Sequence, residues 1–233
     1  MLFERLRETK LSLQPDKCEY LKPELEYLGH LITSEGVKPQ QKHVEKIKNF
    51  PIPKNQKEME RFLALVNYYR KFIPNCGKIT ACLHRLRKKN VKYELNDKEL
   101  KAIEKLKEII TSEPVLKYPD ISKPFILNTD ASNEGIGCIL SQIDDKGNEH
   151  PCAFASKILN AAEKRYSTTE KELLAVQWGS KSFRHFLWGK KYTVYTDHKP
   201  LRGLMKTQSP DISSRCFRLI EKLTDYQPDI IYK

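Results

Sequence analysis

The hydrophobic pattern of this 233-residue chain changes its period at Pro124, and this change constrains the fold more than any other feature. Before Pro124 the apolar residues recur at helical spacing, whereas after it they form short runs rich in strand formers. The runs PFILNTDA, GIGCILSQ and HPCAFASKIL are separated by turn sequences, which predicts a three-stranded antiparallel meander. A long helix, a strand, two helices and a last strand follow. The order βββ-α-β-α-α-β predicts an α/β (α+β) domain over residues 124–233, with helices on a mixed five-stranded sheet.

The first half is expected to be mostly helical after a short hairpin. The run LEYLGHLI contains strand formers around Gly29, which indicates a hairpin or a bulged strand. Asn55 can cap a helix that continues to Pro74. The segment EPVLKYPDISKP contains three prolines and is therefore expected to be a linker, over residues 113–123. The expected helices span residues 56–73, 79–86 and 97–111.

The charge of the chain favours a polyanionic partner. The net charge is +12 and the pI is about 9.3. Residues 1–118 carry 25 Lys and Arg against 16 Asp and Glu, and the remaining residues carry 17 against 14. Most of the basic excess therefore lies in the first half, which suits a protein that grips nucleic acid with one half and acts on it with the other. The alternative is a generically basic protein without such a partner.

Neither a membrane nor an oxidising compartment is indicated by the composition. No run of eighteen apolar residues is present, and the start MLFERLRETK lacks the apolar region of a signal peptide. The six cysteines form no CxxC pair and no Cys/His zinc spacing, so a sulfur-based metal site is not predicted. A reduced intracellular location, cytoplasmic or nuclear, is the simplest expectation.

Three carboxylates are the candidate catalytic groups. Asp130 and Asp197 each end a strand-like run, and Glu172 lies in the first turns of the long helix. Ser167 and Glu170 form a capping box, which assigns Glu170 a structural role and leaves Glu172 to point towards the sheet. A lone acid in either place is more often a turn former or a solvated side chain. Three acids converging on one place predict a site for two Mg²⁺ ions, or Mn²⁺, and phosphodiester hydrolysis.

These residues lie in a chain that resembles the C-terminal part of the Pol polyprotein of gypsy-type LTR retrotransposons. The matching runs are KCEYLKPELEYLGHLITSEGVKP, FLALVNYYRKFIPN, PVLKYPDISKPFILNTDAS, AEKRYSTTEKELLAV, FRHFLWGKKYTVYTDHKPL and DIIYK. The resemblance implies a ribonuclease H-like fold and cleavage of the RNA strand of an RNA/DNA hybrid. It also implies that Asp130, Glu172 and Asp197 are the first three metal-binding acids. The remainder of the Pol polyprotein would be a further partner.

The resemblance also assigns regions to the chain. Residues 1–50 resemble the end of a reverse-transcriptase palm with a primer-grip-like hairpin, and residues 51–112 resemble a thumb. The linker over 113–123 would then lead to a ribonuclease H-like domain over 124–233 that is C-terminally incomplete. Packing is the alternative role for at least two of Tyr68, Tyr69 and Phe72. The expected nucleic-acid contacts are Tyr27, Gly29, His30, Arg61, Arg70, Lys71 and Ser132.

Two elements of the family pattern are missing from the sequence. The Tyr-x-Asp-Asp hairpin of the polymerase centre would precede Met1, and a fourth acid would follow the run DIIYK. We therefore expect no nucleotidyl transfer, and weak or absent cleavage by the chain alone. Three hypotheses stay open: a Mg²⁺-dependent ribonuclease H fragment, a binding remnant that does not cut, and a host-adopted interaction protein. His185 and His198 are assigned no catalytic role. Trp178 and Trp188 are expected on the long helix, in the core.

Overall fold

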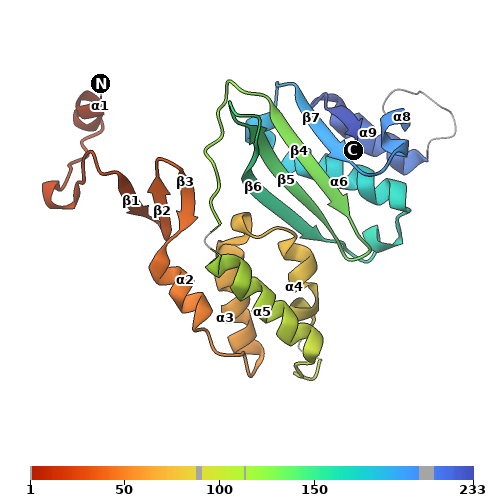
Figure 1. Ribbon diagram of the computed structural model, residues 1–233, viewed down its shortest axis with the longest axis horizontal. Helices are drawn as coiled ribbons and strands as arrows, with labels where there is room; N and C mark the ends of the chain where they lie inside the picture. Colours follow the sequence, from red (N-terminus) through yellow and green to blue (C-terminus); the bar gives the residue numbers. More distant parts are fainter. Residues whose placement is uncertain (1, 88–90, 113, 205–212) are drawn as a thin grey trace.

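A five-stranded mixed sheet forms the centre of the second half of the chain. Figure 1 shows the computed structural model, which describes residues 2–87, 91–112, 114–204 and 213–233. The strand order is β6-β5-β4-β7-β8, with β4–β7 and β7–β8 parallel and the other pairs antiparallel. The predicted meander and the α/β fold are therefore confirmed. The strands are β4 (Phe125–Ala131), β5 (Gly135–Ile143), β6 (Glu149–Ile158), β7 (Tyr192–Thr196) and β8 (Asp229–Tyr232).

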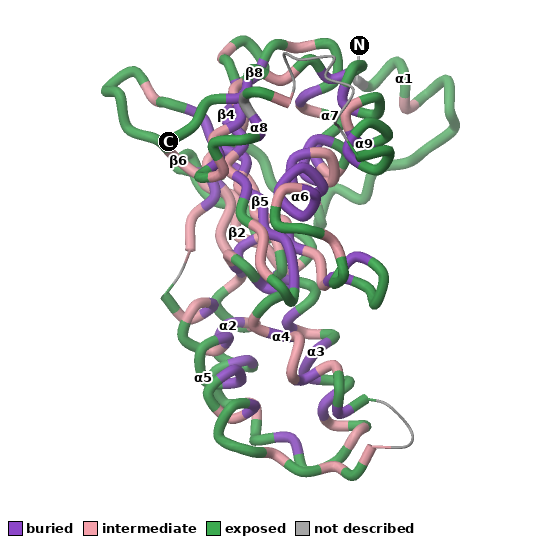
Figure 2. The backbone as a smooth tube through the Cα atoms, turned by 90° about the vertical axis from the view of Figure 1, so that its right-hand side faces the viewer, coloured by how far each residue is buried: buried purple, intermediate pink, exposed green. Residues whose placement is uncertain are grey.

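Helix α6 (Thr168–Ser182) lies against this sheet and is covered on its other side by α9 (Ser214–Thr224). Most of its positions are buried, as Figure 2 shows. The predicted capping box is present, because Ser167 Oγ accepts from the Glu170 N–H at 3.2 Å and Glu170 accepts from the Ser167 N–H at 2.9 Å. Gly179 allows the close approach of α6, since a Cβ there would lie 2.6 Å from Cys138 Sγ. The shorter helices of this half are η3 (Glu163–Arg165), α7 (Arg184–Leu187) and α8 (Pro200–Leu204).

The prediction for Trp188 is wrong. Helix α6 ends before Phe183, and the separate helix α7 carries the chain to Trp188, which is 47% exposed. Its ring packs edge-on against Tyr226 and under the Arg184 guanidinium, so it lies on the surface instead of in the core. Trp178 does pack against the core, as expected.

A second hydrophobic core lies among the helices of the first half. Helix α3 is capped by Asn55, whose Oδ1 accepts from the Glu58 N–H at 3.0 Å, as predicted. It ends at Tyr68 instead of continuing to Pro74, and the chain passes into a short 3-10 helix before Ile73, which is extended before the proline at φ −109° and ψ 107°. The helices are α2 (Gln41–Lys48), α3 (Gln56–Tyr68), η2 (Arg70–Phe72), α4 (Cys76–Arg85) and α5 (Asp97–Thr111). Helix α4 therefore begins three residues earlier than predicted, and α5 has the predicted bounds.

The predicted N-terminal hairpin is present and is part of a three-stranded antiparallel sheet. Its turn is made by Leu28 and Gly29, both with positive φ. The segment that precedes the sheet stands away from the rest of the chain in Figure 1. The elements are α1 (Leu2–Glu8), η1 (Pro15–Lys17), β1 (Glu24–Tyr27), β2 (His30–Thr33) and β3 (Gly36–Pro39).

The segment expected to be a linker is bonded to both halves. Leu116 exchanges two main-chain hydrogen bonds with Val37 of β3, at 2.9 and 3.0 Å, and the Lys117 N–H donates to the Pro151 carbonyl of β6 at 3.0 Å. Gly36 makes room for this bridge, since a Cβ there would lie 2.2 Å from the Leu116 carbonyl oxygen. These bonds tie the two halves together on one side.

The expected division between residues 50 and 51 falls inside one packed unit. Val44 and Ile47 of α2 belong to the same buried cluster as the apolar residues of α3, α4 and α5. We refer to α2–α5 as the helical unit. Among the described helices, none has the length and apolar character needed to cross a bilayer.

Candidate functional site

The fold brings the three predicted acids to one edge of the large sheet. Strands β4 and β7 are parallel neighbours, with Asn128 opposite Tyr195. Asp130 and Asp197 each lie two residues further along, so they occupy equivalent places at the carboxyl ends of the two strands. Both are exposed. Glu172 reaches the same edge from the first turns of α6.

Glu172 is a buried carboxylate in an unfavourable environment. It is 5% exposed, it accepts a hydrogen bond from the Ala131 backbone, and its Oε2 has no hydrogen-bond partner. Burial raises the pKa of Glu172 from 4.5 to about 7, and the negative charges of Asp197 and Asp130 add to the increase. The three acids are thus close enough to interact, and Glu172 lacks a compensating positive charge.

Glu170, two residues earlier, has the opposite environment. Burial raises the pKa of its carboxyl, but hydrogen bonds from the Ser167 backbone, Ser213 and Arg215 together outweigh burial and hold the pKa below its usual value. Ser213 Oγ donates to Glu170 Oε1 at 3.1 Å and Arg215 at 2.9 Å. Glu170 therefore anchors α9 to the start of α6. This arrangement supports the sequence-based choice of Glu172 over Glu170 as the free acid.

The three acids fit a hard divalent cation in ligand type. Carboxylate oxygens are the ligands that Mg²⁺ and Mn²⁺ favour, and the unpaired Glu172 Oε2 is an oxygen that a cation would satisfy. As the side chains stand, no group of three or more His, Cys, Asp or Glu in the described ranges is arranged to hold an ion. Asp130 and Asp197 are exposed, so their side chains can change rotamer.

Contacts around the acids hold the loops that carry them. Thr169 Oγ1 bonds to His198 Nε2 at 2.8 Å, which ties the start of α6 to the residue after Asp197. Lys171 is only 7% exposed, and its Nζ donates to Asn133 Oδ1 at 2.8 Å in the turn after β4. The sequence reasoning missed the Lys171 and Thr169 contacts, because they join residues far apart in the chain and follow no local motif.

Ser132, expected to contact nucleic acid, is engaged in the same turn. Its Oγ donates to the Gly135 carbonyl at 2.9 Å and accepts from the Gly135 N–H at 3.1 Å. Its backbone N–H donates to the same carbonyl at 2.8 Å. The side chain therefore stabilises the β4–β5 turn next to Asp130.

The primer-grip-like hairpin is held by aromatic residues of the helical unit. The Tyr69 hydroxyl donates to the Gly29 carbonyl at 2.8 Å, and the Tyr68 hydroxyl donates to the Leu28 carbonyl. The ring of His30 lies 5.6 Å from Tyr68 and 5.8 Å from Tyr69, and burial lowers its pKa. These contacts leave Tyr27, 59% exposed, at the accessible end of the turn.

The three basic residues expected at the nucleic-acid surface differ in exposure. Arg61 is exposed on α3, whereas Lys71 is partly buried beside the Phe72 ring, and burial lowers the pKa of Lys71. Arg70 Nη2 donates to the Ser156 carbonyl of β6 at 2.6 Å. Tyr69 and Phe72 are fully buried, so the alternative of packing for at least two of the three aromatic residues is confirmed.

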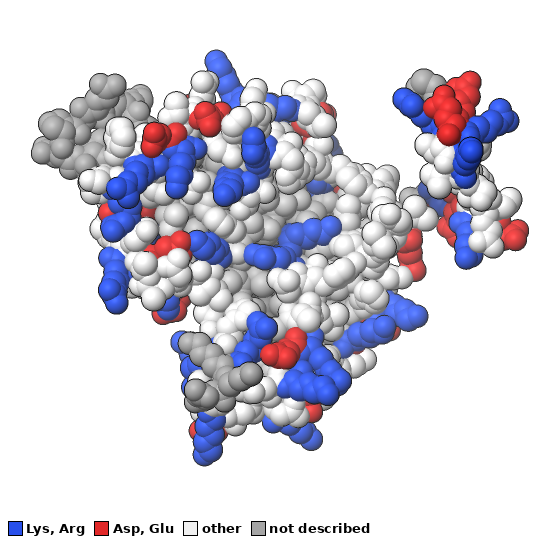
Figure 3. Space-filling view, turned by 180° about the vertical axis from the view of Figure 1, so that it is seen from behind, with Lys and Arg blue, Asp and Glu red and all other residues white. Residues whose placement is uncertain are grey.

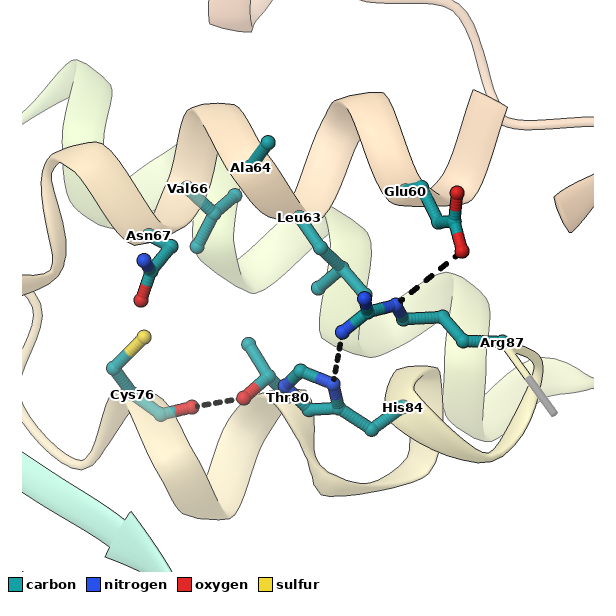
Figure 4. A pocket seen from close by; sticks show the side chains of 9 residues that line it. All are labelled: Glu60, Leu63, Ala64, Val66, Asn67, Cys76, Thr80, His84 and Arg87. Atoms are coloured by element: carbon teal, nitrogen blue, oxygen red, sulfur yellow. Dashed lines mark hydrogen bonds and ion pairs between the residues drawn. The ribbon is translucent and has the colours of Figure 1, made fainter. Parts of the chain in front are cut away.

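A groove follows the helical unit towards the large sheet. Its first part, of about 310 Å³, lies between α3 and α4, where Arg87 approaches both Glu60 and His84 (Figure 4). Cys76, Thr80, His84 and Asn67 are shared with a second part of about 380 Å³. That part is also lined by Arg70, Gly77, Ser156, Lys157, Ile158 and Trp178. Figure 3 shows basic side chains on both halves of one face, with acidic ones between them.

The fold and the matched region define the class of the second half. Residues 120–226 match the family described as the RNase H-like domain found in reverse transcriptase. The five-stranded sheet, α6 and the three acids at its edge lie in or just beyond this range. The chain thus carries an RNase H-like domain of the kind found in reverse transcriptases.

Along its full length the chain matches a segment of the Pol polyproteins of LTR retrotransposons. It is 43% identical over 233 residues to the retrovirus-related Pol polyprotein from transposon 297 of Drosophila melanogaster, a match that covers 100% of this chain and 21% of the relative. The polyprotein from transposon 412 of the same species is 38% identical over 231 residues, covering 99% and 18%. The Tf2-3 polyprotein of Schizosaccharomyces pombe is 33% identical over 234 residues, covering 100% and 18%. The chain spans about a fifth of the length of these relatives.

Solved structures share the arrangement of both halves. The foamy viral protease-reverse transcriptase dRH in complex with ds DNA has a TM-score of 0.81 at 23% identity, covering 100% of this chain and 41% of that chain. The foamy viral protease-reverse transcriptase in complex with RNA/DNA hybrid has a TM-score of 0.75 at 22% identity, and the match covers 94% of this chain and 30% of that chain. At these identities the likeness is one of fold.

Proposed function

We propose that the chain is part of a gypsy-type Pol polyprotein and that its RNase H-like domain hydrolyses the RNA strand of RNA/DNA hybrids with a divalent cation. The observation that carries this proposal is the buried Glu172 carboxylate, which has an unpaired oxygen and a pKa raised by burial and by Asp197 and Asp130. A protein does not gain stability from three uncompensated acids. Their arrangement is understandable if a cation neutralises them during function.

Asp130, Glu172 and Asp197 would hold the cations in this proposal. Bound Mg²⁺ or Mn²⁺ would supply an activated water and charge stabilisation for phosphodiester hydrolysis. The residues of the chain itself determine where this happens. Glu172 is held by the Ala131 backbone, and the start of its helix is tied to His198 through Thr169. These contacts orient the acids before substrate binds.

The first half would bind the hybrid beside this site. Its excess of basic residues favours phosphate contacts that are independent of sequence. Arg61 and Tyr27 are exposed and would contact the hybrid directly. Gly29 and His30 would act indirectly, by shaping the hairpin turn that Tyr69 holds. Arg70, Lys71 and Ser132 have protein partners, so we assign them a supporting role. The palm and thumb assignments are part of this proposal.

Incubation of a labelled RNA/DNA hybrid with Mg²⁺ or Mn²⁺ tests the function. We expect weak cleavage of the RNA strand by this segment alone, as the sequence indicates, and we expect Asp130→Asn and Asp197→Asn to abolish it. Asp145→Asn, at an exposed acid in the β5–β6 turn, is the matched control and should cleave as the wild type does. Cleavage that survives Asp130→Asn would contradict the proposed site.

A binding module that does not cut is the second candidate. It is favoured by the finding that no group of acids in the described part of the chain is arranged to ligate an ion as it stands. In that case Mg²⁺ would not strengthen hybrid binding relative to EDTA, and no variant of the three acids would change the fate of the RNA.

A further inference from the structure

The N-terminus of α4 lies on the sheet face that carries Asp130. The Gly77 N–H donates to Ser156 Oγ at 2.8 Å, and Arg70 binds the carbonyl of the same serine. Ser156 is opposite Gly137 in the β5–β6 pair, and Gly137 is opposite Asp130 in the β4–β5 pair. Side chains of directly opposite residues project to the same face of a sheet. The helical unit therefore contacts the row of residues that ends at Asp130.

Asn75, the residue before α4, lies against the middle of this row. It precedes α4 in the left-handed conformation, at φ 51° and ψ 30°, which asparagine tolerates better than most residues. A Cβ built on Gly137 would lie 2.2 Å from Asn75 Oδ1, so the carboxamide rests directly over that glycine. Neighbouring strands are about 5 Å apart, which places the carboxamide roughly one strand spacing from Asp130.

The left-handed turn accounts for an asparagine at position 75, but among the described residues no hydrogen bond holds its carboxamide over Gly137. The side chain makes no capping hydrogen bond to α4, although it occupies the N-cap position. It is exposed. Cys76 and Gly77, which follow it directly, line the groove that also contains Arg70 and Lys157. Ser156, which also lines this groove, is opposite Gly137, so the carboxamide lies beside the groove and over the strand next to Asp130.

We propose, on the basis of the nuclease function proposed above, that Asn75 is a substrate-contact residue supplied by the helical unit to the nuclease site. Its amide nitrogen donates a hydrogen bond to a phosphate oxygen of the RNA strand next to the phosphodiester at Asp130. A neutral amide suits this position, because it can donate to a phosphate without forming an ion pair with Asp130. The site is then shared by two units, with Asn75 and Asp130 more than fifty residues apart in the sequence.

Two substitutions at Asn75 separate substrate contact from a role in the backbone turn. Asn75→Gly keeps the left-handed turn and removes the amide, whereas Asn75→Asp keeps the shape and adds a negative charge. Asn49→Asp adds the same charge at the exposed end of α2 and is the matched control. The measurements are fluorescence anisotropy of a labelled RNA/DNA hybrid in EDTA, cleavage in Mg²⁺, and thermal unfolding.

We expect Asn75→Gly to raise the Kd for the hybrid about tenfold, as for loss of one hydrogen bond to a charged group. Asn75→Asp should raise the Kd further because of its negative charge. The difference in Kd between Asn75→Asp and Asn75→Gly should become smaller as salt is added. Asn49→Asp should bind as the wild type does, and none of the three should lower the unfolding temperature by more than a few degrees. Wild-type affinity in both Asn75 variants would overturn the contact. Absence of wild-type cleavage, with the Asn75 effects on binding intact, would instead refute the proposed nuclease function.

Gly137→Ala gives an independent test through the same contact. The added methyl group would displace the Asn75 carboxamide, so this variant should weaken hybrid binding about as much as Asn75→Gly does. In the Asn75→Gly background the methyl group meets no carboxamide, and Gly137→Ala should have no further effect. If Gly137→Ala weakened hybrid binding equally in the wild type and in Asn75→Gly, Gly137 would act independently of Asn75, and the proposed contact would be overturned.

Discussion

Replacing Glu172 with glutamine should stabilise the fold while removing its metal response. The carboxyl is 5% exposed, and its pKa in the folded chain is raised from 4.5 to about 7. An increase of this size in the pKa means that the ionised Glu172 carboxylate destabilises the folded chain by about 3 kcal/mol. Glutamine keeps an oxygen for the Ala131 backbone bond but leaves its amide group without a partner, which offsets about 1 kcal/mol. We therefore expect Glu172→Gln to raise the free energy of unfolding by about 2 kcal/mol at pH 8.

The sign of the pH dependence follows from the direction of the shift. The folded chain binds the Glu172 proton more tightly than the unfolded chain, so the wild type loses stability as the pH rises from about 4.5 to about 7. The advantage of Glu172→Gln should thus be present at pH 8 and absent at pH 4.5. Urea unfolding in EDTA at both pH values measures it. The reasoning would be refuted if Glu172→Gln exceeded the wild type in free energy of unfolding by the same amount at both pH values, or did not exceed it at pH 8.

Two controls belong to the same experiment. Glu170→Gln should have the opposite effect and destabilise the chain at pH 8, because the Glu170 carboxylate binds Arg215 and its pKa is lowered. Addition of Mg²⁺ should stabilise the wild type, with a gain that grows with the logarithm of the Mg²⁺ concentration above the Kd, and should leave Glu172→Gln unchanged. Stabilisation of both proteins by Mg²⁺ would place the ion elsewhere.

Three further changes test other parts of the structure. Ser167→Ala removes the cap of α6 and should lower the free energy of unfolding by about 1 kcal/mol in urea titrations. Burial lowers the pKa of His30 in the folded chain, so the wild type should lose stability as the pH falls below about 6.5. His30→Gln should not show this loss, and thermal unfolding at several pH values measures it. Gly36→Ala should lower the free energy of unfolding by more than 2 kcal/mol, because the added Cβ meets the Leu116 carbonyl oxygen. Gly147 also has a positive φ but has open space around it, so Gly147→Ala should lower the free energy of unfolding less. Calorimetric unfolding of both variants measures the difference.

Local rules predicted the parts of the fold that depend on neighbours in sequence. The capping box of Ser167 and Glu170, the Asn55 cap and the bounds of α5 follow from side chains within one turn of each other. The same cap separated Glu172 from Glu170. The end of α3 was missed because Pro74 marks only where the helical region must stop, and no local signal marks the change from α3 to η2 after Tyr68.

Tertiary contacts explain what sequence reasoning missed at the candidate site. The environment of Trp188 depends on Tyr226 and Arg184, which no periodicity links to it. The bond between Lys171 and Asn133 joins a helix to a turn 38 residues away. The position of Asn75 over Gly137 requires the docking of the helical unit on the sheet, and the run FIPN contains no sign of it.

The contacts between the two halves have a consequence for how the nuclease site is held. Leu116 is bonded to β3 and Lys117 to β6, while Arg70 and Gly77 are bonded to Ser156 further along β6. Because Ser156, Gly137 and Asp130 form one cross-strand row, a shift of the helical unit would be transmitted to the residues beside Asp130. The segment expected to be a linker thus belongs to the support of the site. Under the proposed function, a hybrid bound to the helical unit would meet the acids at a distance set by these hydrogen bonds, and that distance would determine which phosphodiester lies at Asp130.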